Sequence, residues 1–396
     1  MKHIFSSILI VMMILTLSGC GSTQTPDTDS SAGSGSQSAP LADSDSGSSS
    51  AVMPQIPADE LKIGVIYIGD PSEGSGYTYT HEQGIVTMRD TLGLSDDQIV
   101  RKTNVDSSDA SAIESAMLEC IEEGCQMIFA TSWGYMDTCE ALAEEYPDVI
   151  FSHICGYKSN GVNFNNYYGR MYQARYLSGI VAGMKTESGK IGYVAAWGSD
   201  NTEVTAGCNA FAMGVYSVNP EAKVYIRVTN SWYDPEGERQ AAQALIDIGC
   251  DVIGQHCDSP NPQLAAEEAG VWGIGFNSDM SSDAPGAVLT SSVWNWGVYY
   301  TEAVRSVIEG TWDCENYYGG LSDGLVGLTD LADFCAEGTA EAVESAARQL
   351  RSGEWDVFTG EIETNTGEII GTEGESLDDN TIQNNIHWYF KNIVEQ

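Results

Sequence analysis

Leu61-Lys62-Ile63-Gly64-Val65-Ile66-Tyr67-Ile68-Gly69 is the stretch that decides the fold. It is a short apolar run, and it ends in the loop residues Asp70-Pro71-Ser72. Such a run is typical of a strand buried on both faces of a parallel sheet and followed by a turn into a helix. An amphipathic stretch from about Tyr79 to Leu92 then completes a first strand–helix unit.

Strands and helices alternate along the rest of the chain. The apolar runs predict further strands at 99–103, 126–130, 149–152, 190–196, 223–228, 251–255, 271–276 and 287–292. Helical periodicity predicts helices at 111–123, 137–145, 170–185, 202–218, 236–248, 262–269 and 298–308. This alternation predicts an α/β protein with two doubly wound, Rossmann-like lobes joined by a hinge. We assign residues 59–168 plus 288–325 to the N-terminal lobe, and residues 169–287 plus 326–396 to the C-terminal lobe.

The first residues indicate export and a lipid anchor. Lys2 precedes an apolar run from Ile4 to Leu17 that is too short for a comfortable membrane span. The run ends in Leu17-Ser18-Gly19-Cys20, which resembles a bacterial lipobox. By that resemblance residues 1–19 are a signal peptide and Cys20 carries the lipid; an uncleaved anchor helix is the alternative. Residues 20–58 are rich in Ser, Gly and Asp and are expected to form a disordered tether.

The acidic charge of the chain limits the classes of partner that it is expected to bind. The 396 residues include 17 Lys and Arg against 57 Asp and Glu, a formal net charge of −40. So acidic a chain repels phosphate backbones and anionic lipid, so we expect no nucleic-acid partner and membrane contact only through the lipid anchor. The sequence has no phosphate-binding Gly-x-x-x-x-Gly-Lys motif, and Gly74-Ser75-Gly76 lacks the third glycine of a dinucleotide motif. We therefore expect no cofactor.

Cysteines and histidines give little sign of catalysis or metal binding. Apart from Cys20, nine of the ten cysteines remain, at irregular spacing that indicates mostly buried free thiols rather than a disulfide framework. Cys250, His256 and Cys257 have no second Cys/His pair at a zinc-like spacing. Neither His81 nor His256 has a Ser or Cys nucleophile in an elbow motif beside it. We predict no metal and no enzymatic activity.

The loops after the expected strands have an unusual composition. In open parallel sheets, ligands bind beyond the carboxyl ends of the strands, so a site is expected in these loops. They combine aromatic rings with carboxylates and amides, which suits a flat, polar, uncharged ligand. For any single Trp, capping the end of a lobe is the alternative role. The candidate ligand-binding residues of these loops and of the helices after them are Tyr77, His81, Trp133, Trp197, Asn209, Trp232, His256, Asp258, Asp279, Trp294, Asn295 and Trp296.

Five strings of residues carry a family resemblance. They begin at Gly76-Tyr-Thr-Tyr-Thr-His81 and end at Leu289-Thr-Ser-Ser-Val-Trp-Asn-Trp296, with Tyr172–Gly183, Ser231–Pro235 and Gln255–Pro260 between them. Together with the lipobox and the two-lobe pattern, they resemble the basic membrane protein family of ABC-transporter substrate-binding lipoproteins, from Leu61 to about Gly360. The resemblance implies a type I periplasmic-binding-protein fold, a purine base or nucleoside as ligand, and ABC permease subunits as partners.

The resemblance also implies individual roles. Tyr77 falls where the family places an aromatic side chain near the base, and Asp279 fits an Asp expected to reach the ribose. Trp294 stands where a ribose-binding Lys is expected. Losing that donor and gaining a ring predicts a free purine base such as adenine rather than a nucleoside. The residues expected to read the purine edge are Asp279, Asn209, Asn295 and His256.

The sequence therefore predicts a monomeric, lipid-anchored receptor on the extracytoplasmic face of the cell membrane, which closes two lobes around a purine. Two alternatives stay open. One is a sugar receptor of the same fold, because aromatic rings stack on pyranoses as readily as on bases. The other is a ligand-sensing lobe for a membrane signalling partner, without a role in transport. The close spacing of Gly179 and Gly183 also predicts a strip where a second backbone packs closely.

Overall fold

The structure is a computed structural model, and it describes residues 53–396. The predicted signal peptide, the predicted lipid site at Cys20 and the tether up to residue 52 lie outside the described residues. Among the helices that are described, none combines the length and the apolar character that a membrane span requires.

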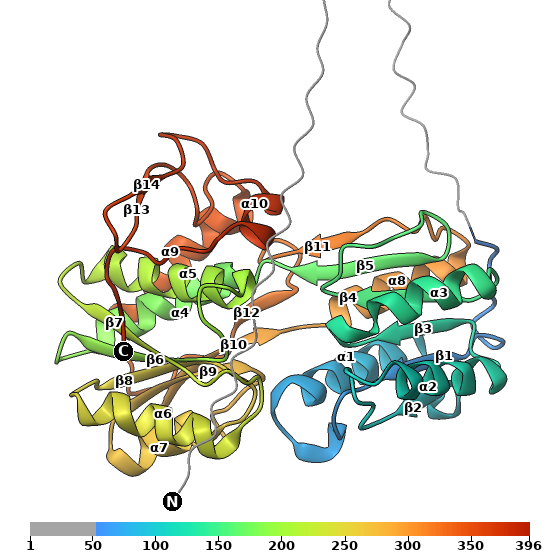
Figure 1. Ribbon diagram of the computed structural model, residues 1–396, viewed down its shortest axis with the longest axis horizontal. Helices are drawn as coiled ribbons and strands as arrows, with labels where there is room; N and C mark the ends of the chain where they lie inside the picture. Colours follow the sequence, from blue (N-terminus) through green and yellow to red (C-terminus); the bar gives the residue numbers. More distant parts are fainter. Residues whose placement is uncertain (1–52) are drawn as a thin grey trace, which may run out of the picture. The chain divides into compact units, whose positions relative to one another are not determined.

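The first sheet has six parallel strands. Its order is β11 (Tyr317–Gly319), β5 (Phe164–Gly169), β4 (Ile150–Ile154), β3 (Met127–Ala130), β1 (Ile63–Ile66) and β2 (Ile99–Lys102). Helices α1 (Gly76–Leu92) and α8 (Gly297–Glu309) pack together on one face, and α2 (Ala110–Glu122) and α3 (Met136–Glu145) cover the other (Figure 1). Strand β1 is buried along its whole length, as its apolar run predicts.

The second sheet has seven strands. Its order is β12 (Val326–Leu328), β10 (Val288–Trp294), β9 (Trp272–Asn277), β8 (Val252–His256), β6 (Lys190–Ala195), β7 (Lys223–Val228) and β15 (Ile393–Glu395). Only β12 runs antiparallel to its neighbour. Helices α4 (Met171–Lys185) and α5 (Thr202–Val218) lie on one face, and α6 (Pro235–Asp247) and α7 (Asn261–Ala269) lie on the other (Figure 1).

The glycine strip of α4 is the contact with α5. A Cβ atom on Gly179 would lie 2.1 Å from the carbonyl oxygen of Phe211, and one on Gly183 would lie 2.9 Å from that of Val215. Real side-chain carbon atoms do not approach carbonyl oxygens so closely, so only glycine lets the two helix backbones meet here. The close backbone packing predicted for this strip is confirmed.

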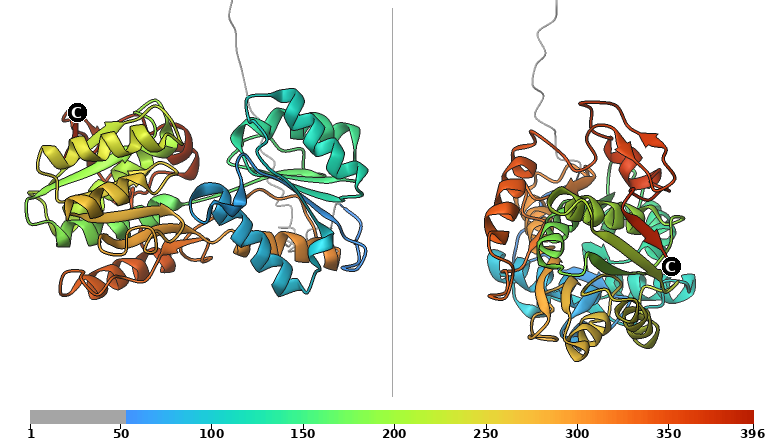
Figure 2. Two further views of the ribbon diagram at one scale, coloured as in Figure 1. Left: turned by 90° about the horizontal axis from the view of Figure 1, so that it is seen from below. Right: turned by 90° about the vertical axis from the view of Figure 1, so that its left-hand side faces the viewer.

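The chain passes between the two sheets three times: after β5, between β10 and α8, and between β11 and β12 (Figure 2). The predicted boundaries put residues 288–325 in the first lobe. Strand β10 instead pairs with β9, so residues 288–294 belong to the second sheet. Only α8 and β11 of that range accompany the first sheet. The sequence of a buried apolar strand does not indicate which sheet the strand joins. The predicted boundary at residue 288 was therefore placed before β10 instead of after it.

Several elements escaped the sequence prediction. Strand β5 contains an Asn pair, a residue type that is disfavoured in strands. The amide of Asn165 is tolerated there because it donates to Tyr299 Oη at 3.0 Å and to the Glu315 carbonyl at 2.9 Å. Beyond α8 the missed elements are β11, β12, α9 (Thr339–Ser352), β13 (Ile362–Glu363), β14 (Ile369–Ile370), α10 (Asp379–Asn384) and β15.

The nine cysteines of the described region are all unpaired, and seven of them are buried. Their burial agrees with the prediction that they act as small apolar side chains. Within residues 53–396, no group of three or more His, Cys, Asp and Glu side chains is placed to hold a metal ion.

Candidate functional site

A cleft lies where the carboxyl ends of both sets of parallel strands meet, and it has two compartments. The aromatic compartment has a volume of about 330 Å³ and is bounded mainly by residues that follow β1, β3, β7 and β8 and by the last residues of β9 and β10. The hinge-side compartment has a volume of about 390 Å³ and reaches the crossings after β5 and β11. The compartments are continuous because they share Trp133, Cys155, Tyr168, Glu203 and Trp232.

The start of α1 brings the first lobe into contact with the second. Gly76 has a φ of +84°, and its N–H donates to Ser278 Oγ at 2.9 Å. A Cβ at this position would lie 2.6 Å from the carbonyl oxygen of Asp258, so glycine is required for the contact. The next residue, Tyr77, lines the aromatic compartment and donates its hydroxyl to the Thr131 carbonyl at 2.9 Å. Its ring is therefore held at the wall of the cleft.

Three stacked rings support one side of the aromatic compartment. Trp294 lines the compartment and stacks on Trp296, with ring centroids 4.4 Å apart and an angle of 14°. Trp296 stacks in turn on His81 at 4.8 Å and 12°. Both Trp296 and His81 are fully buried, and His81 Nδ1 lies 2.7 Å from Tyr300 Oη. Burial lowers the pKa of His81 to about 3, so the histidine is a neutral part of the support.

A carboxylate and an amide form the polar edge of the compartment. Asn277 donates from Nδ2 to Asp258 Oδ1 at 2.8 Å, and the buried Oδ1 of Asn277 has no partner. Burial raises the pKa of Asp258 to about 7, although the Asn277 hydrogen bond opposes this shift. The loop that carries Asp258 is held by Glu238, which accepts from the Ser259 N–H at 3.2 Å. The edge thus offers two oxygen acceptors to a ligand.

A buried arginine lies behind the cleft. Arg175 is fully buried, its guanidinium lies 3.7 Å from the centroid of the Phe276 ring, and it donates to the Gln255 carbonyl. Burial, and then the charge of Arg175, lower the pKa of His256 to about 4. His256 is therefore neutral at pH 7. Both of its ring nitrogens lack a hydrogen-bond partner, and Nε2 lies 3.7 Å from Glu203 Oε1.

Comparison with known proteins identifies the family. The family model described as ABC transporter substrate-binding protein, PnrA-like, matches residues 61–355. The chain belongs to this family. A PnrA-like protein is the solute-binding component of an ABC transporter, so the chain is a binding protein and not an enzyme. The family resemblance inferred from the sequence is confirmed.

Two relatives and two solved structures are informative. A purine-binding protein of Brucella abortus is 36% identical over 82% of this chain and 90% of its own. A candidate ABC transporter glucose-binding protein of Haloferax volcanii is 41% identical over 59% of each chain. An ABC transporter solute-binding protein of Conexibacter woesei has a TM-score of 0.62 at 20% identity, over 75% of this chain and 98% of its own. A transcriptional activator of Bacillus halodurans has a TM-score of 0.65 at 20% identity, over 74% and 99%. The two structures confirm the predicted type I periplasmic-binding-protein fold of this PnrA-like protein.

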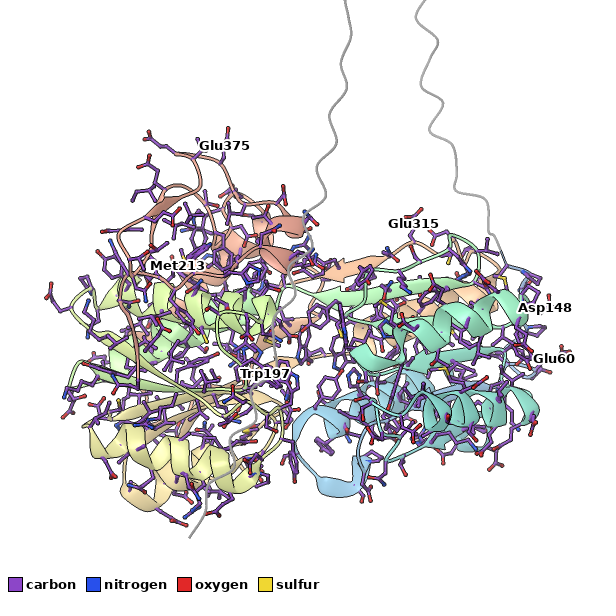
Figure 3. All side chains as sticks on the ribbon, viewed as in Figure 1. Glu60, Asp148, Trp197, Met213, Glu315 and Glu375 are labelled. Atoms are coloured by element: carbon purple, nitrogen blue, oxygen red, sulfur yellow. The ribbon has the colours of Figure 1, made fainter. Side chains whose placement is uncertain are left out.

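The structure brings many of the predicted site residues of the PnrA-like protein together. Those that line the cleft are Tyr77, Trp133, Trp232, His256, Asp258 and Trp294. Trp296 and His81 lie behind Trp294, outside the lining. Trp197 follows β6, on the side of the second sheet nearest the first (Figure 3), but it does not line either compartment.

Three of the residues predicted to read the purine edge lie outside the cleft. Asn209 is buried in α5, where Nδ2 donates to the Trp388 carbonyl at 2.7 Å and Oδ1 accepts from the Phe390 N–H at 2.8 Å. Asp279 is exposed and accepts from the Ser281 N–H at 2.9 Å. Asn295 is exposed and donates to the Gly324 carbonyl at 2.9 Å. Each of the three side chains is bonded to backbone groups outside the cleft lining, and only Asp279 finds its partner close in the sequence.

The cleft also contains residues that the sequence reasoning missed, chiefly Tyr168, Glu203, Phe276 and Asn277. Tyr168 belongs to the unpredicted strand β5. Asn277 stands two positions before Asp279 and ends β9. Side chains two positions apart point to the same face of a strand, so alternation does not separate Asn277 from Asp279, and the choice depended on where the strand ends. Glu203 could have been found as the first acidic residue after the Asn201 helix cap.

Proposed function

We propose that this PnrA-like protein is the receptor of a purine importer and binds the purine ring in the aromatic compartment. The observation that carries the proposal is the combination of aromatic rings from both lobes, including Tyr77, Trp232 and Trp294, with the Asp258–Asn277 edge. Each stack of a base on an aromatic ring is worth about 1–3 kcal/mol. The Brucella relative is named for purine binding, which supports the same ligand class.

We further propose that the ligand is a free base such as adenine rather than a nucleoside. A free base carries an imidazole N–H, which a nucleoside lacks because the sugar replaces that hydrogen. The carboxylate of Asp258 is a suitable acceptor for this N–H. Trp294, stacked on Trp296, lines the same compartment at the position where the family resemblance expects a ribose-binding Lys. We expect the base to bind at least several-fold more tightly than its nucleoside.

The location and the partners follow from the sequence. We infer that Cys20 carries a lipid that anchors a monomeric receptor on the extracytoplasmic face of the cell membrane, and that the receptor delivers its ligand to ABC permease subunits. Mass spectrometry of the mature N-terminal peptide tests the anchor. An unmodified Cys20 or a retained Lys2 would contradict it.

Two measurements test the ligand class. Mass spectrometry of small molecules released from the denatured, purified protein should detect a purine. Adenine at 100 times its Kd should stabilise the fold by about 2.7 kcal/mol and raise the melting temperature. Glucose and ribose are the comparison ligands, because the Haloferax relative supports a sugar as the second candidate. A melting shift with glucose and none with any purine would replace the purine proposal with a sugar receptor.

A further inference from the structure

Two loops of the second lobe carry side chains of the aromatic compartment. The loop after β7 carries Trp232, the loop after β8 carries Asp258, and both side chains line the compartment. A backbone hydrogen bond joins the two loops, because the Asp258 N–H donates to the Trp232 carbonyl at 2.8 Å. The ring of one loop and the carboxylate of the other therefore keep their relative positions only while the loops stay paired.

A buried carboxylate holds the same two loops together. Glu238 lies near the start of α6 and is fully buried. Its Oε1 accepts from the Asp234 N–H at 3.0 Å, in the loop of Trp232. Its Oε2 accepts from the Ser259 N–H at 3.2 Å, in the loop of Asp258, and the Ser259 hydroxyl donates to the same oxygen. One side chain thus bonds both loops to α6.

These contacts require both oxygens of Glu238 to be acceptors. All three partners are N–H or O–H donors, so a side chain with a donor at either position loses a bond to one loop. Burial raises the pKa of Glu238, and the hydrogen bonds from Ser259 and Asp234 act against this shift. Since a buried charge is costly unless hydrogen bonds satisfy it, the carboxylate depends on both loops.

The charge of Glu238 also acts on Asp258. Burial raises the pKa of Asp258 to about 7, and the negative charges of Glu238 on α6 and Glu203 on α5 raise it further. Burial also raises the pKa of Tyr77 on α1 and of the adjoining Cys257 well above their ordinary values, so both are neutral at pH 7. A neutral side chain in place of Glu238 should therefore lower the pKa of Asp258.

We propose that Glu238 is a positioning residue of the binding site, which holds the loops of Trp232 and Asp258 in one arrangement before the ligand enters. Glu238 lines neither compartment, so it acts through the two loops rather than on the ligand itself. This inference rests on the proposed function, because its test uses adenine as the ligand.

Calorimetry with adenine on Glu238→Gln tests the inference. The variant keeps the size of the side chain but replaces one acceptor oxygen with an NH2 group, so one loop loses its bond. Gln255 still donates to the Ser259 carbonyl at 2.8 Å, so the loop after β8 keeps a second support and the protein should stay folded. Losing one hydrogen bond lowers the share of molecules with both loops in place, so the Kd at pH 8 should rise about fivefold.

The pH dependence of binding gives a second measurement on the same variant. The wild type should bind adenine about tenfold more tightly at pH 8 than at pH 6, because Asp258 loses its charge between them. With the charge of Glu238 removed, Asp258 should stay ionised to lower pH. The ratio of the two affinities should therefore be smaller in Glu238→Gln than in the wild type.

Two further variants separate the hydrogen bonds from the charge. Glu236→Gln is the matched control, because Glu236 is exposed on the same helix and accepts a hydrogen bond from Gln240 one turn away. It removes the same charge and should leave both the Kd and the pH ratio unchanged. Ser259→Ala removes only the hydroxyl contact with Glu238 and keeps the charge. Its Kd at pH 8 should rise, while its pH ratio stays at about tenfold.

The outcomes separate this inference from the proposed function. A Kd and a pH ratio in Glu238→Gln equal to those of the wild type, even with a lower melting temperature, would show a purely structural role and overturn the inference. An equal loss of affinity in Glu236→Gln would overturn it too. If Glu238→Gln does not fold, an unchanged Kd in Ser259→Ala has the same meaning. A wild type that binds no adenine would refute the proposed function, and this inference with it.

Discussion

Replacing Asp258 with Asn tests the polar edge of the aromatic compartment. The substitution keeps the size of the side chain, and its new amide oxygen can still accept the 2.8 Å hydrogen bond from Asn277. The free protein should therefore keep its fold. What changes is the second position of the side chain, where a carboxylate oxygen that accepts from the ligand becomes an NH2 group that cannot.

The expected loss of affinity for adenine follows from the strength of a hydrogen bond to a charged carboxylate. Hydrogen bonds to charged groups contribute about 1.5–3 kcal/mol, so Asp258→Asn should weaken the binding of adenine by about 10-fold to 150-fold. The titration is carried out by calorimetry at pH 8, where the pKa of about 7 leaves Asp258 mostly ionised. Thermal unfolding without ligand shows whether the variant is folded.

Asp279→Asn is the matched control, because Asp279 is exposed, lies outside the cleft lining and accepts a hydrogen bond from the nearby Ser281 N–H. It should bind adenine like the wild type. If Asp258→Asn kept full affinity while Asp279→Asn lost it, the position of the polar edge would be refuted and the sequence-based choice of Asp279 would be restored.

Three further predictions concern pH, stacking and stability. Adenine should bind about tenfold more tightly at pH 8 than at pH 6. The pKa of Asp258 is raised to about 7, so at pH 6 the side chain is mostly protonated and no longer offers a carboxylate oxygen to the ligand. An affinity that is equal at the two pH values in calorimetry would contradict this. Tyr77→Ala should weaken adenine binding by about 1–3 kcal/mol through the lost ring, and an unchanged Kd would exclude stacking there. Asn209→Ala should lower the free energy of unfolding by about 1–3 kcal/mol, because it leaves two backbone groups at residues 388 and 390 without a partner. The affinity for adenine should change little. Urea denaturation measures the stability, and calorimetry measures the affinity.

Much of the fold could be predicted because, in the central strands, the pattern of apolar residues in the sequence agrees with the burial seen in the structure. The run around Ile63 is apolar throughout, and β1 is buried on both faces. The helices that cover the sheets end close to the residues that the sequence indicated, such as Leu92 for α1 and Lys185 for α4. In these elements local propensity and tertiary packing favour the same structure.

The rest depended on long-range contacts that no local pattern encodes. Strand β5 forms despite its two Asn residues, because the side chain of one of them donates a hydrogen bond to Tyr299, more than 130 positions away. Asn209 was predicted to bind the ligand, yet its side-chain amide is hydrogen-bonded to backbone groups at residues 388 and 390. For the site, the rule that ligands lie beyond strand ends located Trp232, Asp258 and Trp294 correctly in the cleft lining. It could not distinguish Asn277 from Asp279, since that choice turns on the last residue of one strand.

The three crossings between the sheets have a consequence for how the protein is made. The first sheet is completed only by β11 at residues 317–319, and the second only by β15 at residues 393–395, which pairs with β7 about 170 positions earlier. Neither sheet is a continuous stretch of chain, so the first sheet cannot be completed before residue 319 has been made, and the second cannot be completed before residue 395 has been made. Pairings over such separations form slowly and leave sheet edges exposed meanwhile. The outer edge of β7 therefore stays unpaired until residues 393–395 have been made.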